Sequence, residues 1–343
     1  MRQASVATVA MVVISASLSP TMSFHTKKSL LPFSRPFHSS SACFLNRFLF
    51  DTSEILPQQQ DNSTERVVVI PKDDYRTIHA AKVLGVKNGD TVRAGLVSCD
   101  KDKGGLLTDH ATIEWLPEGK VKKAEPLRNG NPPGSLQLRL ESLSEPAHMY
   151  DDLMVSLILA LPRPLQLGRM LPMISQMGVD QLILTQARKV PKDYFGSHLF
   201  RKPEVLRERL IEGLCQAGDV RLPKVHTVKN LSRFLSEDLD SMFPSDRYAR
   251  VIAHPQRATE GATVPKRMRD IQFPTETPPR LVIAVGPEGG WEEPGELDKF
   301  QELGFQQITL GTRVLRSDCA VVSLLSLAHD VCQEHSQQQT ENP

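Results

Sequence analysis

Apolar residues recur along the chain from residue 66 onward, in two patterns that predict two kinds of structure. Between residues 66 and 147 the runs are short and lie between turns rich in Gly, Asp and Asn, which is typical of a small β-barrel. The expected strands of this region are 66–71, 91–97, 111–116 and 137–140, with a helical segment at 79–84. After residue 148, longer apolar runs alternate with segments of helical periodicity, which predicts an α/β domain with a parallel sheet.

The second region carries the clearer pattern. Its expected strands are 153–161, 179–185, 251–255, 281–284 and 307–310, and its expected helices are 167–177, 294–303 and 318–333. Gly178 and Gly304 follow two of these helices, where glycine commonly ends a helix. The last helix carries apolar residues around most of its surface, so we expect it to be buried or to lie at a subunit interface.

These patterns divide the chain into four parts. We expect a leader at 1–60, a barrel domain at 61–147, an α/β domain at 148–335 and a disordered tail at 336–343. Within the α/β domain, residues 256–279 are rich in Pro, Arg and Thr and show no periodicity, which predicts an inserted surface loop.

The expected leader differs in composition from the rest of the chain. No Asp or Glu occurs before Asp51, whereas Ser, Lys and Arg are frequent, as in organellar transit peptides. Its apolar stretch, Val6–Ser17, is too short to span a membrane, and we expect no membrane association. An apolar stretch before a basic, Phe-bearing segment favours a plastid; a mitochondrial leader and a merely disordered tail are the alternatives.

Charge and cysteine content exclude some classes of protein. The formal net charge is only +1, so binding to nucleic acid would need a local patch. Between Arg188 and Arg233 there are eleven Lys or Arg against five acidic residues, which fits either a phosphate-binding surface or a solvated helical face. The five cysteines show no metal-ligand spacing, so we expect neither a metal site nor a disulfide framework.

Two segments near the C-terminus carry the candidate chemistry. They are Val285–Trp291, with the sequence VGPEGGW, and Leu310–Ala320, with the sequence LGTRVLRSDCA. Each follows an expected strand, and α/β proteins place their binding loops at the carboxyl ends of strands. Glycine lets the backbone approach a ligand closely, and arginine adds fixed positive charge.

These two segments resemble the signatures of the RsmE family, the 16S ribosomal RNA (uracil-N3)-methyltransferases of the SPOUT superfamily. Further matches are Gly178-Val179 and the stretch from Glu212 to Pro223, so the resemblance covers about residues 65–333. The chain departs from the family at Met173, Gln176, Cys215 and Cys319. We expect these departures to affect the geometry of the substrate site more than the binding of the cofactor.

The resemblance implies a SPOUT-type parallel sheet with a C-terminal trefoil knot, preceded by a PUA-like β-barrel, and a homodimer that binds S-adenosylmethionine. It implies that the cofactor lies against the backbone and apolar side chains of the two C-terminal segments. The expected cofactor-binding residues are Ala284, Val285, Gly286, Gly289, Leu310, Gly311, Arg313, Val314, Leu315 and Ala320.

The implied reaction is methylation of N3 of a uridine in small-subunit ribosomal RNA. Uracil N3 must lose a proton, and Arg316 before the last helix suits stabilisation of the resulting negative charge. The alternative roles for Arg316 are a phosphate contact and a salt bridge to Asp318 or Glu288. We expect Asp318, or else Glu288, to act as the base, although Asp318 in the first helical turn would also be favourable for its charge alone. We interpret Cys319 as a packing residue.

The expected RNA contacts are Arg188, Lys189, Gln216 and Arg221, together with the barrel domain. The partner would be small-subunit ribosomal RNA or an assembled ribosomal subunit. Two other functions remain open: a catalytically silent RNA-binding assembly factor, and a SPOUT enzyme that methylates a ribose 2′-oxygen.

Overall fold

The computed structural model describes residues 47–57, 66–97, 105–118, 130–145, 154–255, 264–274 and 278–341. Most of the expected leader lies outside these residues. Among the described residues, none belongs to a helix that is both long and apolar enough to cross a bilayer.

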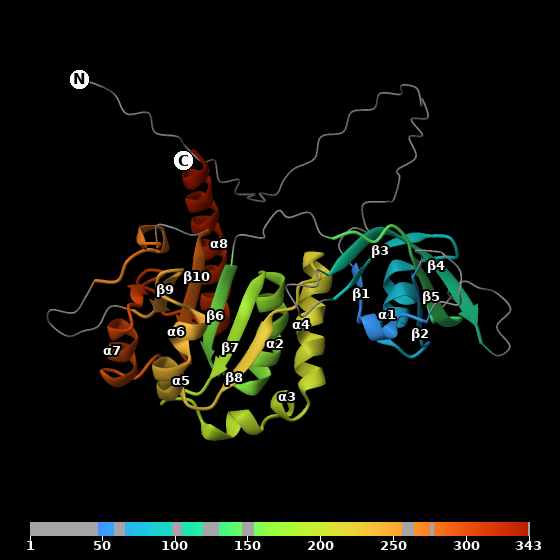
Figure 1. The fold of residues 1–343 in the computed structure, drawn as a ribbon. Coiled ribbons are helices and arrows are strands. Elements are labelled where there is room, and N and C mark those ends of the chain that lie inside the picture. The colour runs from blue at the N-terminus through green and yellow to red at the C-terminus, as the bar shows by residue number, and fades with distance from the viewer. Residues whose placement is uncertain are drawn as a thin grey trace, which may run out of the picture. The chain divides into compact units, whose positions relative to one another are not determined.

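The described residues up to 145 form a five-stranded sheet with a core of its own (Figure 1). The strands are β1 (Arg47–Phe50), β2 (Arg66–Ile70), β3 (Thr91–Leu96), β4 (Leu106–Pro117) and β5 (Gly134–Leu140). Their order is β1-β3-β4-β5-β2; β1 is parallel to β3 and the other neighbours are antiparallel. The helix α1 (Tyr75–His79) continues into a π-helical turn (Ala80–Leu84), which Gly85 ends with a φ of 61°.

Strand β1 was not predicted, and it corrects the leader boundary that we placed at residue 60. Its four residues pair with β3, and Phe48 and Phe50 are buried in the core of this sheet. The Arg47 guanidinium is also buried and donates hydrogen bonds to Ala94 O at 2.9 Å and Thr108 O at 3.1 Å. A four-residue strand inside an acid-free, basic stretch gives too little periodicity to be separated from a leader.

We expect that a chain starting at residue 61 folds less stably than one starting at residue 45. Burial of a Phe side chain stabilises a protein by about 1.5–3 kcal/mol, so loss of Phe48 and Phe50 should lower the free energy of unfolding by roughly 3–6 kcal/mol. Chemical denaturation of the two truncated chains measures this difference. Equal stabilities would show that β1 does not contribute to the fold.

The residues from 154 onward form a six-stranded sheet in which all pairs are parallel. The strands are β6 (Met154–Ala160), β7 (Val179–Thr185), β8 (Lys224–Val228), β9 (Tyr248–Ala253), β10 (Arg280–Val285) and β11 (Gln306–Ile308). Their order is β11-β9-β10-β6-β7-β8. Except for β8, each was predicted to within a few residues, because strands covered on both faces are continuous apolar runs.

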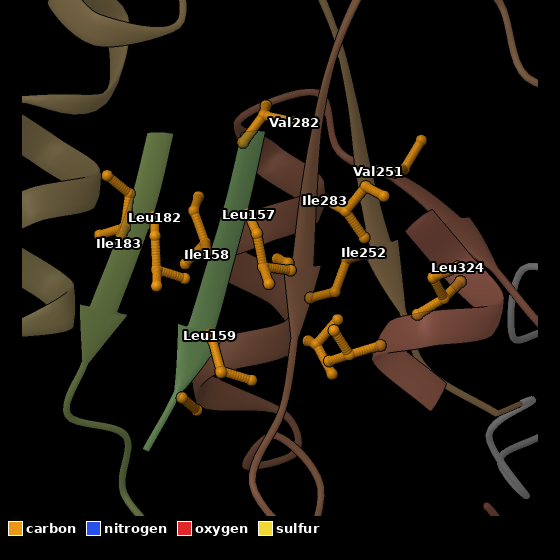
Figure 2. Close-up of a cluster of buried hydrophobic side chains, with 14 of the residues drawn as sticks. Leu157, Ile158, Leu159, Leu182, Ile183, Val251, Ile252, Val282, Ile283 and Leu324 are labelled. Atoms are coloured by element: carbon orange, nitrogen blue, oxygen red, sulfur yellow. The ribbon is translucent and has the colours of Figure 1, made fainter. Parts of the chain in front are cut away.

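Helices cover this sheet and close its core. They are α2 (Pro164–Gln176), α3 (His198–Arg201), α4 (Pro203–Ala217), α5 (Leu231–Glu237), α6 (Leu239–Met242), α7 (Gly295–Glu302) and α8 (Ser317–Glu341). Figure 2 shows apolar side chains of β6, β7, β9 and β10 lying close together, with Leu324 of α8 beside them. Gly178 and Gly304 follow α2 and α7 with φ angles of 73° and 79°, as expected for helix ends.

Two expected unstructured segments are partly ordered. Within the 256–279 insertion, Met268 and Ile271 are buried in the core, and Lys266 forms a bridge with Ile308 of β11. The insertion therefore covers the edge strand of the sheet at this point, which limits pairing with other chains. The tail at 336–343 was expected to be disordered, but α8 continues to Glu341.

Candidate active site

A cavity of about 990 Å³ lies at the carboxyl ends of the parallel strands. Segments that follow β6, β7, β9, β10 and β11 all contribute to its wall. The central neighbours are β6 and β10, and from them the chain continues toward opposite edges of the sheet, to β7 and to β11. Such a switch point is where open α/β sheets bind their ligands. This cavity is therefore the candidate site.

One wall of the cavity is the segment Gly286–Trp291, here called the glycine loop, which follows β10 directly. Gly290 has a φ of 69°, which a residue without a Cβ adopts freely, and its N–H donates to Pro287 O at 2.8 Å. The loop folds over the buried indole of Trp291. A Cβ on Gly286 would lie only 3.2 Å from that ring, a tighter contact than most side chains make, so the close approach favours glycine.

The segment after β7 anchors the glycine loop from the side. Lys189 donates from Nζ to Gly289 O at 2.9 Å and to Trp291 O at 3.1 Å. The neighbouring Arg188 N–H donates to Glu296 Oε1 of α7 at 2.7 Å. These contacts connect two loops about one hundred residues apart in the sequence, and they keep the glycine loop at the mouth of the cavity.

A second wall is the segment Thr309–Arg316, here called the arginine loop, between β11 and α8. The Thr309 hydroxyl donates to Gly311 O at 3.0 Å and accepts from Gly311 N at 3.2 Å. Gly311 has a φ of 116°, and a Cβ built on it meets no protein atom within 4 Å. Beyond it, Val314 is 95% exposed, so this loop presents an apolar side chain to the surroundings.

Arg316, Asp318 and Gln166 form one hydrogen-bonded cluster beside the cavity. Arg316 donates to Asp318 Oδ2 at 2.6 Å, and Gln166 Nε2 of α2 donates to the same oxygen at 2.7 Å. Arg316 also lies 3.4 Å from Gln166 Oε1. Arg316 is 72% exposed and lines the cavity, whereas Asp318 is largely covered. Asp318 thus holds the arginine, which remains open to a ligand.

The environment of Asp318 makes it a weak proton acceptor. Burial raises the pKa of its carboxyl, but hydrogen bonds from the Cys319 backbone N–H, from Arg316 and from Gln166 outweigh burial, and the pKa lies below its ordinary value. Asp318 is therefore ionised throughout the neutral range. A general base works best with a pKa near the operating pH, so this geometry disfavours the basic role expected for Asp318.

Two further carboxylates line the cavity. Glu288 of the glycine loop is half-exposed and pairs with Arg163, whose Nε lies 3.2 Å from Glu288 Oε2. Glu293 Oε1 lies 2.7 Å from Nε2 of His254, a buried residue that follows β9. The expectations from the sequence included only Glu288. A His-Pro pair after a strand was the one available signal for His254.

The expected cofactor residues gather at this cavity with one exception. Those that line it are Val285, Gly286, Gly289, Leu310, Gly311, Arg313, Val314, Leu315 and Ala320. Ala284 does not: it is fully buried within β10. The side chains that line the cavity without having been predicted include Arg163, Gln166 and Arg169 of the β6–α2 segment. They lie outside both C-terminal segments, so only the fold brings them here.

The expected RNA contacts differ in their position relative to the cavity. Only Lys189 lines the cavity, and its ammonium is engaged by backbone carbonyls of the glycine loop. Arg188 pairs with Glu292 at 3.5 Å. Arg221 forms a bidentate pair with Asp219, and Gln216 belongs to α4, away from the cavity wall. Within the described ranges, no group of three His, Cys, Asp or Glu side chains could hold a metal ion.

Comparison with known families gives a match over the second sheet domain. The model of the RNA methyltransferase domain family matches residues 150–329. This range contains the glycine loop, the arginine loop and the cluster around Arg316.

Individual relatives extend the similarity over most of the chain. Ribosomal RNA small subunit methyltransferase E of Treponema pallidum is 26% identical over 280 residues, which cover 79% of this chain and 90% of the relative. The structure of the protein of that name from Neisseria gonorrhoeae, bound to S-adenosyl methionine, aligns with a TM-score of 0.55 at 20% identity. The alignment covers 84% of this chain and 98% of that one. A methyltransferase from Legionella pneumophila, in complex with the same cofactor, aligns with a TM-score of 0.53 at 19% identity, over 83% and 97% of the two chains.

Proposed function

Because this chain belongs to the RNA methyltransferase domain family, we propose that it transfers a methyl group from S-adenosylmethionine to N3 of a uridine in small-subunit ribosomal RNA. The observation that carries the proposal is the cavity at the switch point, which joins two glycine-containing loops to an exposed arginine. The 26% identity with a ribosomal RNA small subunit methyltransferase E supports this choice of substrate.

The residues of the cavity fit the cofactor. Gly286 and Gly311 line the cavity with backbone, and Gly311 leaves open space where a side chain would stand, as a closely held ligand requires. Apolar side chains of Val285, Leu310 and Leu315 offer contacts for a flat, largely apolar ring such as adenine. These residues would hold S-adenosylmethionine, which supplies an electrophilic methyl group on a sulfonium.

The protein side of the reaction follows from the charges at the cavity. Loss of the N3 proton spreads negative charge over the uracil imide, and the Arg316 guanidinium would stabilise that charge. Asp318 and Gln166 fix the orientation of Arg316. We assign proton acceptance to Glu288, because it is half-exposed and lines the cavity, whereas three donors engage Asp318.

The RNA strand would approach over the arginines around the cavity. Arg169 and Arg313 are exposed, line the cavity and have no acidic partner among the described residues. Arginine suits phosphate recognition because its planar fork can donate two parallel hydrogen bonds. N3 lies on the Watson–Crick edge, so the target uridine must be unpaired when it reaches the cavity.

We expect that replacing Lys189 with methionine weakens the binding of S-adenosylmethionine about three- to tenfold. The substitution removes two charge-assisted hydrogen bonds to the glycine loop, and solvent exposure limits the effect. Titration calorimetry measures the affinity. Lys192→Met, an exposed lysine on the same segment, should leave it unchanged. An unaltered affinity in Lys189→Met would show that the loop keeps its conformation without this anchor.

A homodimer with a knotted C-terminus is part of the proposal. Helix α8 follows the edge strand β11 in the sequence, yet it packs on β10 and β6 in the middle of the sheet, as expected if the chain passes through its own loop. Large apolar side chains are exposed on α2, on the arginine loop and on α8, and a partner subunit would cover them. They are Leu165, Met173, Val314, Leu315 and Leu327.

The N-terminal sheet and the leader complete the proposal. Five strands around a separate core support a PUA-like barrel that contacts RNA. The acid-free, basic composition before Asp51 supports delivery to an organelle, with a plastid favoured over a mitochondrion. A fluorescent protein fused after residue 60 would report the compartment, and a diffuse cytosolic signal would contradict delivery to an organelle.

The test of the function uses the full chain, labelled S-adenosylmethionine and organellar small ribosomal subunits or their free RNA as acceptor. Mass spectrometry of the digested nucleosides should find 3-methyluridine. A 2′-O-methylated nucleoside would replace the proposal by ribose methylation. Binding of both cofactor and RNA without any transfer would indicate a silent assembly factor.

A further inference from the structure

Residues 264–274 of the insertion, here called the strap, pair with the outer side of the edge strand β11. The Lys266 N–H donates to Gln307 O at 2.9 Å, and the Lys266 C=O accepts from Thr309 N at 3.0 Å. The inner side of the same strand pairs with β9. Although β11 has only three residues, it is therefore held on both sides, and the outer contact reaches the first residue of the arginine loop.

The strap is itself fixed to the fold. Met268 and Ile271 are buried in the core of the second domain. The side chain of Gln306, in β11, accepts hydrogen bonds at Oε1 from Lys266 Nζ and from Gln272 N, both at 2.9 Å, and donates from Nε2 to Gln272 O at 2.9 Å. Buried apolar side chains and paired backbone groups are what raise local stability, so the strap can hold its neighbour in place.

Thr309 connects the strap to the cavity. Its N–H donates to Lys266 O, while its hydroxyl donates to Gly311 O at 3.0 Å and accepts from Gly311 N at 3.2 Å. Gly311 has a φ of 116°, lines the cavity and has open space where a Cβ would stand. None of the strap residues, 264–274, lines that cavity. The strap thus reaches the cavity wall through the backbone and hydroxyl of Thr309.

We propose that the strap is a positioning element of the cofactor site, which acts through Thr309 on the backbone of Gly311. The inference rests on the proposed function, so the bound molecule is S-adenosylmethionine. A loop that is already held in its binding conformation loses less freedom when the ligand binds, so the strap raises the affinity without touching the ligand. Coupling between two sites is reciprocal, so the bound cofactor in turn holds the strap in place.

Hydrogen exchange in the full-length protein tests the reciprocal effect. Addition of S-adenosylmethionine should slow the exchange of the Lys266 and Gln272 amides, although neither residue lines the cavity. A strap that only stabilises the fold would exchange at the same rate with and without the cofactor. Helix α5, whose residues do not line the cavity, serves as the control and should not change.

Two proline variants separate the action of the strap from a general loss of stability. Lys266→Pro removes the N–H and the ammonium that hold the strap to β11. Arg267→Pro places the same ring on the next residue, whose φ of −83° is close to that of proline. Calorimetry should give a Kd for S-adenosylmethionine that is about three- to tenfold higher in Lys266→Pro and unchanged in Arg267→Pro.

A second pair of variants tests the connecting residue. Thr309→Val keeps the shape of the side chain but loses the hydroxyl that bonds the Gly311 backbone. It should raise the Kd about three- to tenfold and abolish the protection of the strap by the cofactor. Thr309→Ser keeps a hydroxyl and should restore both.

The outcomes distinguish this inference from the proposed function. Failure of the unmodified protein to bind S-adenosylmethionine would overturn both. Normal binding, with an unchanged exchange rate in the strap and an unchanged Kd in Lys266→Pro, would overturn only the positioning role. Equal losses of affinity in the two proline variants would also contradict it, and so would protection of the strap that persists in Thr309→Val.

Discussion

Replacing Arg316 with alanine is expected to lower kcat for methyl transfer by about 100- to 1,000-fold, with the affinity for S-adenosylmethionine largely kept. Removal of one preorganised donor that faces developing negative charge has an effect of this size in other enzymes. Arg316 is 72% exposed at the cavity and is oriented by Asp318 at 2.6 Å, so its guanidinium is directed without being enclosed. The measurements are single-turnover rates with small subunits and calorimetry with the cofactor alone.

Matched variants show whether the loss of rate is specific to Arg316 and to the shape of its guanidinium. Arg316→Lys keeps the charge but loses the fork, so we expect it to recover only part of the rate. Arg267 is an exposed arginine that does not line this cavity, and Arg267→Ala should be neutral. An unchanged kcat in Arg316→Ala would remove this residue from the mechanism. A large rise in the cofactor Kd would instead place Arg316 against the cofactor.

Replacing Gly311 with valine should abolish measurable binding of S-adenosylmethionine. A Cβ at Gly311 would meet no protein atom within 4 Å, so the added side chain would occupy free space in the cavity rather than disturb the core. In addition, a φ of 116° is unfavourable for a β-branched residue, so the arginine loop would have to change its conformation. Both effects should prevent S-adenosylmethionine from binding, and calorimetry measures the loss of affinity.

Gly304 offers a matched comparison for backbone strain. It has a φ of 79°, a Cβ there would also meet nothing within 4 Å, and it lies after α7, outside the wall of the cavity. Gly304→Val should therefore lower thermal stability without changing cofactor affinity. If Gly311→Val binds the cofactor as tightly as the unmodified protein, the arginine loop is not part of the cofactor site.

Local sequence patterns were sufficient to predict most of the strands and helix ends of the second domain. The run Val179–Thr185 was predicted with the bounds that the structure has, and the glycines after α2 and α7 adopt the positive φ angles expected of helix ends. Burial on both faces makes a parallel strand a continuous apolar run, so its signal is contained in a few adjacent residues. By contrast, β1 is four residues long and becomes a strand only by pairing with β3.

The candidate site was predictable in part for the same reason. Nine of the ten expected cofactor residues line the cavity, because both loops directly follow strands and the carboxyl ends of parallel strands share one edge. The expected RNA contacts were chosen by charge and by the resemblance of the stretch from Glu212 to Pro223 to the RsmE family. Charge does not indicate that Arg221 pairs with Asp219, or that Lys189 is engaged by carbonyls of the glycine loop.

The sequence by itself determined the parallel sheet, the two loops and the residues that can approach a ligand there, since these follow from short-range patterns and from the absence of side chains at glycines. The tertiary structure decided which distant groups meet. Gln166 lies 152 residues from Asp318 and yet donates to it at 2.7 Å, and the Trp291 indole faces Gly286 because the glycine loop folds over it. The order of the strands and the packing of the helices set such contacts, and neither is encoded within any single segment of the chain.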